Sequence, residues 1–474
     1  MIMHKFTSFF LVLIFAFVSG CAVGPDYKRP SVETPSAWRL EESQAKDLAN
    51  TAWWEQFDDH VLNDMVSTAL KGNKDLLIAA ARIEEFVGKY GATRADNFPQ
   101  VAGAAAASRT RVSESINAPL PPAYDNPYTD HQLVGIVSWE IDIWGKIRRS
   151  TEAARANLLG TEEGQKTVIM FLVSAVAGAY IDLRDLDREL EIAESTLKSR
   201  EDALHLFELR FDNGVISELE LRQAQLEYEL ALATVPVIQK LVSQQENLIS
   251  ILLGRNPGAI VRGKAIDQLV LPEVPSGLPS DLLSRRPDIR QAEQDLIATN
   301  AQIGVAKAAY FPSISLTGLF GAQSANLSNL FTGPAQAWSF GLPVTIPIFT
   351  AGAIGGRVKA AEAVQKQALV RYQQVIQQAY REVNNALIDQ SKTREQLQAQ
   401  KRQVETATSY AKLARLKYDN GYASYLEVLD AERSMFNVQL AHARTQANLF
   451  KAFVTIYKSM GGGWVTKAED LAAD

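Results

Sequence analysis

Residues 211–221 read FDNGVISELEL, and residues 418–428 repeat the pattern as YDNGYASYLEV. Each stretch contains an Asp-Asn-Gly turn, and glycine suits the left-handed backbone conformation that ends a helix. A repeat of roughly 200 residues is far longer than the 20–50 residues of a solenoid unit. We therefore interpret it as the duplication of a whole structural unit.

The duplication extends towards the N-terminal side of both turns. Five positions recur with one constant spacing: Asp75, Gly91, Ala95, Phe98 and Pro99 match Asp288, Gly304, Ala308, Phe311 and Pro312. This spacing is slightly longer than that of the two turns, so the repeated unit covers most of the 474 residues and includes a small insertion. Two similar units in one chain suggest a pseudosymmetric object such as a ring or a tube.

Long helices are predicted ahead of both turns. Apolar residues occupy every seventh position from 176 to 211, and a second set three residues further on is broken by Arg200. This spacing predicts a helix that packs along a narrow seam with its neighbours. The second repeat keeps the same register, with an interruption at Gln390. A helix over 146–211 would be roughly 100 Å long at about 1.5 Å per residue.

Strands with alternating apolar and polar residues precede each long helix. The predicted strands cover residues 101–112, 137–143, 311–322 and 338–348, with polar loops at 113–128 and 323–337. Each repeat thus contributes one hairpin with an apolar and a polar face, which is typical of a membrane β-barrel with a wet interior. Pro343 and Pro347 are unfavourable in the middle of a sheet. Four strands cannot close a barrel, so the chains must associate.

The N-terminus predicts export and lipidation. Lys5 precedes an apolar run at 9–18, which is typical of a secretory signal and too short for a transmembrane helix. Cys21, the only cysteine, follows Val18-Ser19-Gly20 where a bacterial lipoprotein is cleaved and acylated; the alternative is a cysteine placed there by chance. We expect N-palmitoyl and S-diacylglycerol groups on Cys21 and no other cofactor. No later run of about 18 apolar residues is evident, so a membrane crossing would use strands.

Composition and motifs argue against several other functions. The net charge of −6 and the absence of a basic stripe argue against nucleic acid as a partner. Histidines occur singly, without metal-ligand spacing, at His4, His60, His131, His205 and His442. No nucleophile motif is present, and the glycine-rich stretch 352–356 lacks the Lys-Ser/Thr of a phosphate loop. We therefore expect no enzyme activity, no catalytic residues and no metal, and interpret 352–356 as a strand-to-helix junction.

Several motifs occur in a specific order along the chain: CAVGPDYKRP at 21–30, Trp53-Trp54 with Phe57, RRPDI at 285–289, Phe311-Pro312 and GGGW at 461–464. In these motifs the sequence resembles the TolC-like outer membrane factor family. More narrowly, it is similar to the lipoprotein branch of OprM and NodT type, which serves tripartite efflux systems of the resistance-nodulation-division (RND) class.

The resemblance implies a fold class. It is an α+β membrane protein, mainly α, in which three chains with four strands each form a 12-stranded β-barrel continued by a long periplasmic α-helical barrel, with an equatorial mixed domain. The implied divisions are a signal peptide at 1–20, a lipidated and equatorial segment at 21–60, a first repeat at 61–265, a Pro-rich connection at 266–280, a second repeat at 281–464 and a tail at 465–474. Helices are expected at 61–96, 146–211, 217–253, 287–309, 352–418 and 424–460.

The resemblance also implies a function. The chain is expected to be the lipid-anchored outer membrane exit duct of a multidrug or small-molecule efflux pump, extending into the periplasm. Its expected partners are two further copies of itself, a periplasmic adaptor (a membrane fusion protein), an inner-membrane RND transporter and outer membrane lipid. The alternatives are an outlet for type I protein secretion, an adaptor, or a structural coiled-coil lipoprotein. The last two lack paired transmembrane-type hairpins.

Site residues follow from the same resemblance. The periplasmic aperture is expected at Leu426, Asp430, Asp419 and Tyr418, and the adaptor contact at Asn213, Gly214, Asn420 and Gly421. Leu426 and Asp430 lie one helical turn apart, so three chains would form a ring of each. The alternative is a seam leucine and a solvated aspartate. Asp419 departs from the basic residue of the OprM pattern, so Arg415 or Lys417 is expected to replace it in closing the tip.

Overall fold

The computed structural model describes residues 22–32, 34–35, 38, 52–113, 115, 125–272, 274 and 281–461. The described residues form two compact units. Unit 1 contains 22–31, 83–161 and 292–372, and unit 2 contains the remaining described segments. The signal at 1–20, Cys21 and the tail at 465–474 lie outside the described residues.

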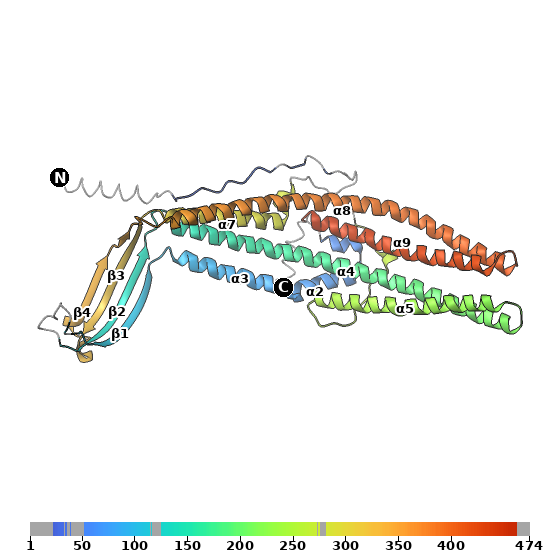
Figure 1. The fold of residues 1–474 in the computed structure, drawn as a ribbon, viewed down its shortest axis with the longest axis horizontal. Coiled ribbons are helices and arrows are strands. Elements are labelled where there is room, and N and C mark those ends of the chain that lie inside the picture. The colour runs from blue at the N-terminus through green and yellow to red at the C-terminus, as the bar shows by residue number, and fades with distance from the viewer. Residues whose placement is uncertain are drawn as a thin grey trace. The chain divides into compact units, whose positions relative to one another are not determined.

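Three pairs of helices confirm the duplication (Figure 1). The pairs are α3 (Lys74–Ala95) with α7 (Pro287–Ala308), α4 (Lys146–Asp212) with α8 (Ala353–Asp419), and α5 (Glu218–Leu252) with α9 (Tyr425–Ser459). The two members of each pair have equal lengths, and the offset between them is larger for the first pair than for the other two. The small insertion therefore lies in the first repeat, between its short first helix and its 67-residue helix, where its strands are.

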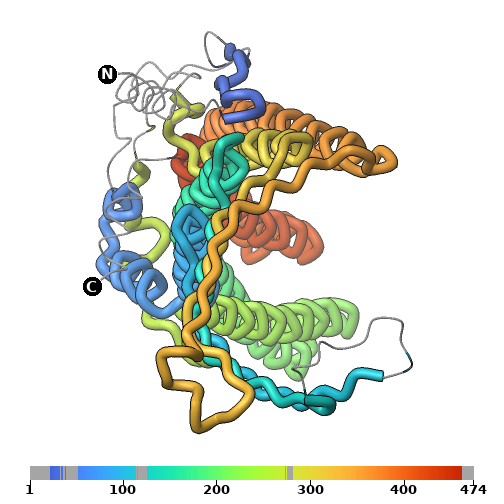
Figure 2. The backbone as a smooth tube through the Cα atoms, turned by 90° about the vertical axis from the view of Figure 1, so that its left-hand side faces the viewer, coloured from blue at the N-terminus to red at the C-terminus, as the bar shows by residue number. Residues whose placement is uncertain are grey.

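Unit 1 contains a single antiparallel sheet. Its strands are β1 (Gln100–Thr110), β2 (Tyr128–Glu140), β3 (Ser313–Ser324), β4 (Gln336–Gly341) and the short β5 (Val344–Thr345). The order is β1-β2-β3-β4, with β5 also paired to β3. Figure 2 shows these strands following an open, curved path. The two predicted hairpins are joined through β2 and β3, which the alternation patterns did not indicate, and β1 and β4 are left as edges.

Two predicted strands have different bounds in the structure. The prediction of one strand at 338–348 is wrong, because β4 ends at Gly341 and only Val344–Thr345 pairs again. Pro343 lies at this break, where it has no N–H to donate, although its carbonyl still accepts from the Ser315 N–H at 3.1 Å. The strand predicted at 137–143 also differs, since β2 already begins at Tyr128 and ends at Glu140.

The helix predicted at 61–96 is two helices. α2 (His60–Gly72) ends before Asn73, whose backbone is extended, and α3 begins at Lys74. The Asn73 Oδ1 accepts from the backbone N–H groups of Asp75 (3.0 Å) and Leu76 (3.2 Å), so it caps α3. Its Nδ2 donates to the carbonyl of Leu252, the last residue of α5 (2.9 Å). Asn73 breaks the predicted helix because its side chain forms hydrogen bonds with the start of α3 and with the end of α5 at the same time.

The core of unit 2 contains the apolar part of α4. Among the described residues, this helix alone has an 18-residue window apolar enough to cross a membrane, with a mean hydropathy of 1.6. The expectation that no such run exists is therefore wrong. Most of that window is buried within the protein, and Ile169, Val176 and Tyr180 pack in one cluster with Trp53 and Phe450. The stretch is a core helix face.

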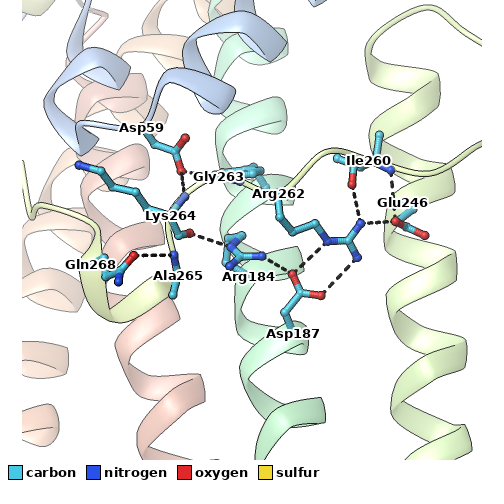
Figure 3. Close-up of polar contacts among 11 residues, drawn as sticks. Asp59, Arg184, Asp187, Glu246, Ile260, Arg262, Gly263, Lys264, Ala265 and Gln268 are labelled. Carbon is cyan, nitrogen blue, oxygen red and sulfur yellow. Dashed lines mark hydrogen bonds and ion pairs between the residues drawn. The ribbon is translucent and has the colours of Figure 1, made fainter.

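A polar clasp holds the segment that follows α5 against unit 2 (Figure 3). The Arg262 guanidinium lies 3.2 Å from both carboxylate oxygens of Asp187 on α4 and pairs with Glu246 on α5. Arg184 on α4 donates to the Lys264 carbonyl (2.8 Å). Charge-assisted bonds of this kind are the stronger ones in proteins, so they fix the segment across both helices.

The clasp continues to the start of α2. The Asp59 Oδ2 accepts from the Lys264 N–H (2.9 Å) and from the Tyr180 hydroxyl (2.6 Å). The Tyr180 hydroxyl also accepts from the Gly263 N–H (3.1 Å). Burial and the Asp59 carboxylate raise the pKa of Tyr180 above its ordinary value. This tyrosine therefore stays neutral and keeps donating at every physiological pH.

In unit 1 an N-terminal strap, residues 22–30, packs on the junction between strands and helices. The Val23 N–H donates to the Trp144 carbonyl (2.9 Å), and Asp26 pairs with the buried Arg149 of α4 (2.5 Å). Gly24 lies against Gly304 so closely that a Cβ on either would overlap the backbone of the opposing segment. This contact requires two glycines.

Candidate functional site

The two Asp-Asn-Gly turns have the same geometry. Gly214 and Gly421, which follow the ends of α4 and α8, have left-handed φ values of +69° and +76°. The Gly214 N–H donates to Phe211 O and the Val215 N–H to Arg210 O, both at 2.8 Å. The second turn repeats this pair of bonds at the equivalent positions. Such a pair of bonds closes a helix C-terminus and satisfies its last carbonyl groups.

Side chains complete both turns. The Nδ2 groups of Asn213 and Asn420 each donate at 2.7 Å to the carbonyl four residues earlier. At the start of α5 the Ser217 N–H donates to the Glu220 carboxylate (2.9 Å), and the matching bond at α9 joins Ser424 to Glu427 (3.4 Å). Both predicted adaptor-contact turns are therefore tightly closed, with their glycines exposed.

Beneath the turns the two helical hairpins of unit 2 share an apolar tip cluster. It consists of Phe207, Ala224, Ala411, Ala414, Tyr425, Val428, Leu429 and Ala431, contributed by α4, α5, α8 and α9. The ring of Phe207 lies 4.3 Å from that of Tyr425 and stacks on Tyr418 at 6.1 Å. Burial and the nearby Glu220 carboxylate raise the pKa of Tyr418. Tyr418, a predicted aperture residue, thus stabilises the tip from within.

Leu426 and Asp430 lie on the opposite face of α9 from the tip cluster. Leu426 is 59% exposed, whereas Tyr425, Val428 and Leu429 are buried. Within one chain Leu426 is therefore not a seam residue. Asp430 is exposed as well, and its Oδ2 accepts from the Tyr410 hydroxyl of α8 (3.1 Å). This bond raises the pKa of Tyr410.

Asp419 does not pair with Asp430. Its Oδ2 lies 3.7 Å from the Nε of Arg415, one turn earlier on α8. Arg415 also reaches Glu432 on α9, at 4.0 Å. Arg415 therefore links α8 to α9. The sequence predicted that Arg415 helps to close the tip, but it did not indicate Glu432 as the partner.

Two features of the tip were missed from sequence. Asp430 of α9 accepts a hydrogen bond from Tyr410. Arg200, at a seam position of α4, is buried with two acidic partners. Only the break in the heptad pattern at Arg200 could have indicated the second feature. In the part of the chain that the structure describes, no group of three or more His, Cys, Asp and Glu side chains is arranged to hold a metal.

Comparison with known proteins assigns this architecture to a family. The family model of the outer membrane efflux protein matches residues 65–255 and 278–462, one match in each repeat. The chain belongs to the outer membrane efflux protein family. Members of this family are channels for efflux, and the mainly helical fold with one sheet agrees with the fold of its solved structures.

Individual relatives of this efflux family match nearly the whole chain. The solvent efflux pump outer membrane protein SrpC of Pseudomonas putida is 35% identical over 94% of this chain and 96% of its own length. The cation efflux system protein CusC of Escherichia coli O6:H1 is also 35% identical, with the same coverage. The solved outer-membrane channel OprN is 31% identical, covers 94% of this chain and all of its own, and has a TM-score of 0.86.

Proposed function

We propose that this protein is the outer membrane exit duct of a tripartite efflux pump, which conducts its cargo passively outwards from an inner-membrane transporter and a periplasmic adaptor. The observation that carries the proposal is the duplicated architecture of one antiparallel sheet and two 67-residue helices. Relatives and solved structures that match over nearly the full length are named as efflux proteins and channels of the outer membrane.

Three chains form the conducting unit. The sheet of one chain has two open edges, β1 and β4, and unpaired backbone groups at an edge are costly in lipid. If β1 of each chain pairs with β4 of the next, three chains with four main strands give a closed 12-stranded barrel, which is large enough to enclose water. The exposed apolar side chains of β4, Trp338 and Phe340, then face lipid.

The tip of the helical hairpins is the periplasmic gate. In a trimer, the exposed face of α9 places three copies of Leu426 and of Asp430 around the axis. The leucines narrow the aperture with apolar surface, and the aspartates attract cations. The two exposed turns at Gly214 and Gly421 offer the adaptor two nearly identical docking points per chain, since their hydrogen bonds match.

A lipid on Cys21 anchors the same end of the protein as the sheet. Support comes from the strap, because Ala22 packs against Gly145 at the junction between β2 and α4. Tyr27 and Arg29 then both bind Glu293 of α7, at 3.0 and 2.7 Å. A strap fixed at these points places Ala22, the residue that follows Cys21 in the sequence, beside the junction between β2 and α4.

The cargo is determined elsewhere in the pump. Relatives with the same 35% identity are named for solvent efflux in one case and cation efflux in the other. A duct that has no cargo site of its own fits both names. The exported compounds are therefore expected to follow the inner-membrane transporter with which this chain assembles.

Two measurements test the proposal together. Deleting the gene should raise susceptibility to the compounds exported by the cognate transporter, and restoring it should reverse the effect. The purified full-length protein should form pores in planar lipid bilayers. A protein that is a monomer in detergent and never conducts would overturn the proposal.

A further inference from the structure

A charged layer interrupts the packing of α4 against its neighbours. At the seam positions of α4, Ala193 and Phe207 are buried in apolar clusters, and Arg200 between them is only 5% exposed. Ala193 belongs to the main core of unit 2, and Phe207 belongs to the tip cluster. Between these two clusters a buried charge stands at the seam position of α4 where an apolar side chain would be expected.

The charges connect all four helices of the two hairpins. On α4, Arg200 pairs with Glu432 of α9 and lies 3.7 Å from Glu227 of α5. Glu227 is 5% exposed and also accepts from the Nε of Arg433 (2.9 Å). On α8, Arg415 lies 4.0 Å from Glu432. We call these five residues the Arg200 layer.

Two clefts that are partly open to solvent flank the layer. One of about 510 Å³ lies among α4, α8 and α9, and one of about 230 Å³ lies among α4, α5 and α9. Thr196 and Arg200 line both of them. Protein interiors are otherwise close-packed, and well-packed layers resist deformation. A layer with free space on both sides of its central side chain can rearrange without first displacing apolar neighbours.

The energetics of the layer depend on shared charges. Each carboxylate is shared, Glu432 between Arg200 and Arg415, and Glu227 between Arg200 and Arg433. A buried ion pair adds little net stability, because desolvation of both charges offsets their attraction. Removing one partner is costly, since the other charge is left buried and unpaired. The layer therefore specifies how the helices align more than how tightly they hold.

We propose that Arg200 is a positioning residue for the gate helix α9, and that the two tip hairpins bend apart at the Arg200 layer when this cation is lost. The inference rests on the proposed gate, because it is α9 that carries Leu426 and Asp430. It adds that the position of the gate is set by one buried cation on α4, on the far side of the tip cluster from the turns, and not only by contacts at the aperture itself.

The decisive comparison is between one lost charge and a layer whose three central charges are all replaced by apolar side chains. Arg200→Met leaves the buried Glu227 and the half-buried Glu432 without the cation that they share, so the hairpins should separate. The triple variant Arg200→Met/Glu227→Met/Glu432→Met replaces the three central charges with apolar side chains, and such replacements are often neutral or stabilising. Of the two remaining arginines, Arg433 is half exposed and Arg415 keeps Asp419 as a partner. Arg222→Met removes an exposed arginine of α5 outside the layer and is the matched control.

Distances at the tip measure the bending without requiring conduction. Spin labels at Val215 and Tyr422, both exposed, report the separation of the two turns within a chain when labelled chain is diluted into unlabelled chain. Arg200→Met should broaden and lengthen this distance, whereas the triple variant and Arg222→Met should keep the wild-type distribution. An unchanged distance in Arg200→Met, or an equal change in the triple variant, would overturn the inference.

Conductance then links the bending to the gate. In planar bilayers Arg200→Met should raise the leak conductance several-fold, and the triple variant should conduct no more than wild type. Failure of wild type to conduct contradicts the proposed duct, while the label distances still decide whether Arg200 positions the tip. If wild type conducts and Arg200→Met has the same leak conductance as wild type, only the positioning role is contradicted.

Discussion

Single residues in the helices of unit 2 show how burial acts on charge, and Asp185 of α4 is a clear example. Its Oδ1 is buried and accepts no hydrogen bond among the described residues. Asp182 and Glu189 lie on either side along α4, bound to Lys451 (2.7 Å) and Arg444 (3.0 Å) of α9. Burial, followed by the charge of Glu189, raises the pKa of Asp185 to about 7.

The raised pKa predicts a pH-dependent stability. The native state keeps a proton that the unfolded chain releases near its ordinary pKa of 3.8, so stability falls as pH rises from about 4 to about 7. Asp185→Asn removes this cost and should raise the unfolding temperature at pH 8 by about 2 °C or more, with little effect at pH 4. Thermal unfolding at both pH values checks this, with Asp202→Asn, an exposed residue, as control. Equal shifts at pH 4 and 8 would contradict it.

Asp430 predicts a second effect at this scale. Asp430→Asn removes the charge from the proposed ring and should lower the cation preference of the channel, whereas Asp430→Ala should also raise its leak. Tyr410→Phe removes the 3.1 Å bond to Asp430 and keeps the charge, so cation preference should stay as in wild type. Reversal potentials in a salt gradient separate the three variants. If Tyr410→Phe lowers the cation preference as much as Asp430→Asn does, a ring of charge at Asp430 is excluded.

Residue-level prediction from sequence was limited by partners far away in the chain. Leu426 and Asp430 could be named from a family motif, and the structure places them on one exposed face. The role of Arg200 could not be predicted, because its partners lie on α5 and α9 and only the fold brings them together. The sequence showed a cation, Arg200, at a seam position, but it did not show why a cation lies there.

At the scale of elements, most of the predicted helix boundaries came from the family resemblance. The bounds predicted for the long and short helices agree with the structure within one or two residues, apart from the break at Asn73. That break depends on a hydrogen bond to Leu252, which no local pattern contains. Strand bounds were harder to predict, since the polar first half of β2 is paired in the sheet but does not alternate clearly.

The turns predict how a glycine substitution acts. Gly421→Val places a β-branched side chain at φ +76°, a conformation that costs non-glycine residues about 1–2 kcal/mol, and fills an exposed docking point. Efflux should be lost while the protein still inserts and assembles. Drug susceptibility together with oligomer bands from outer membrane fractions measures both. Gly91→Val, on a helix face with open space around it, is the control, and equal loss of efflux there would contradict a specific role for the turn.

The whole molecule is predicted to be complete only as an assembly. Within one chain β1 and β4 are three strand spacings apart, about 14 Å at roughly 4.8 Å each, and a disulfide needs Cα atoms within about 7 Å. The strand register places the following residues on one face: Ala102, Ala104 and Ala106 of β1, and Ala337 and Ser339 of β4. Cysteine pairs, one from each strand, should therefore cross-link only between chains.

Non-reducing gels check this arrangement. Double variants should give covalent dimers and trimers, and single variants should give monomers, because Cys21, the only natural cysteine, is expected to be acylated. If none of these cysteine pairs cross-links, the result contradicts the pairing of β1 with β4 between subunits. The need for association could be inferred from sequence by counting strands, but the joining of the two hairpins through β2 and β3 required the structure.

The open edges of the sheet have a consequence for biogenesis. A lone chain in the bilayer would expose the unpaired amides of two strands to hydrocarbon, at a cost of several kcal/mol for each group. For the proposed barrel, monomers are therefore expected to have no stable inserted intermediate, so that entry into the membrane and subunit joining form one concerted event. The rate of maturation should accordingly depend steeply on how many newly exported copies meet in the periplasm.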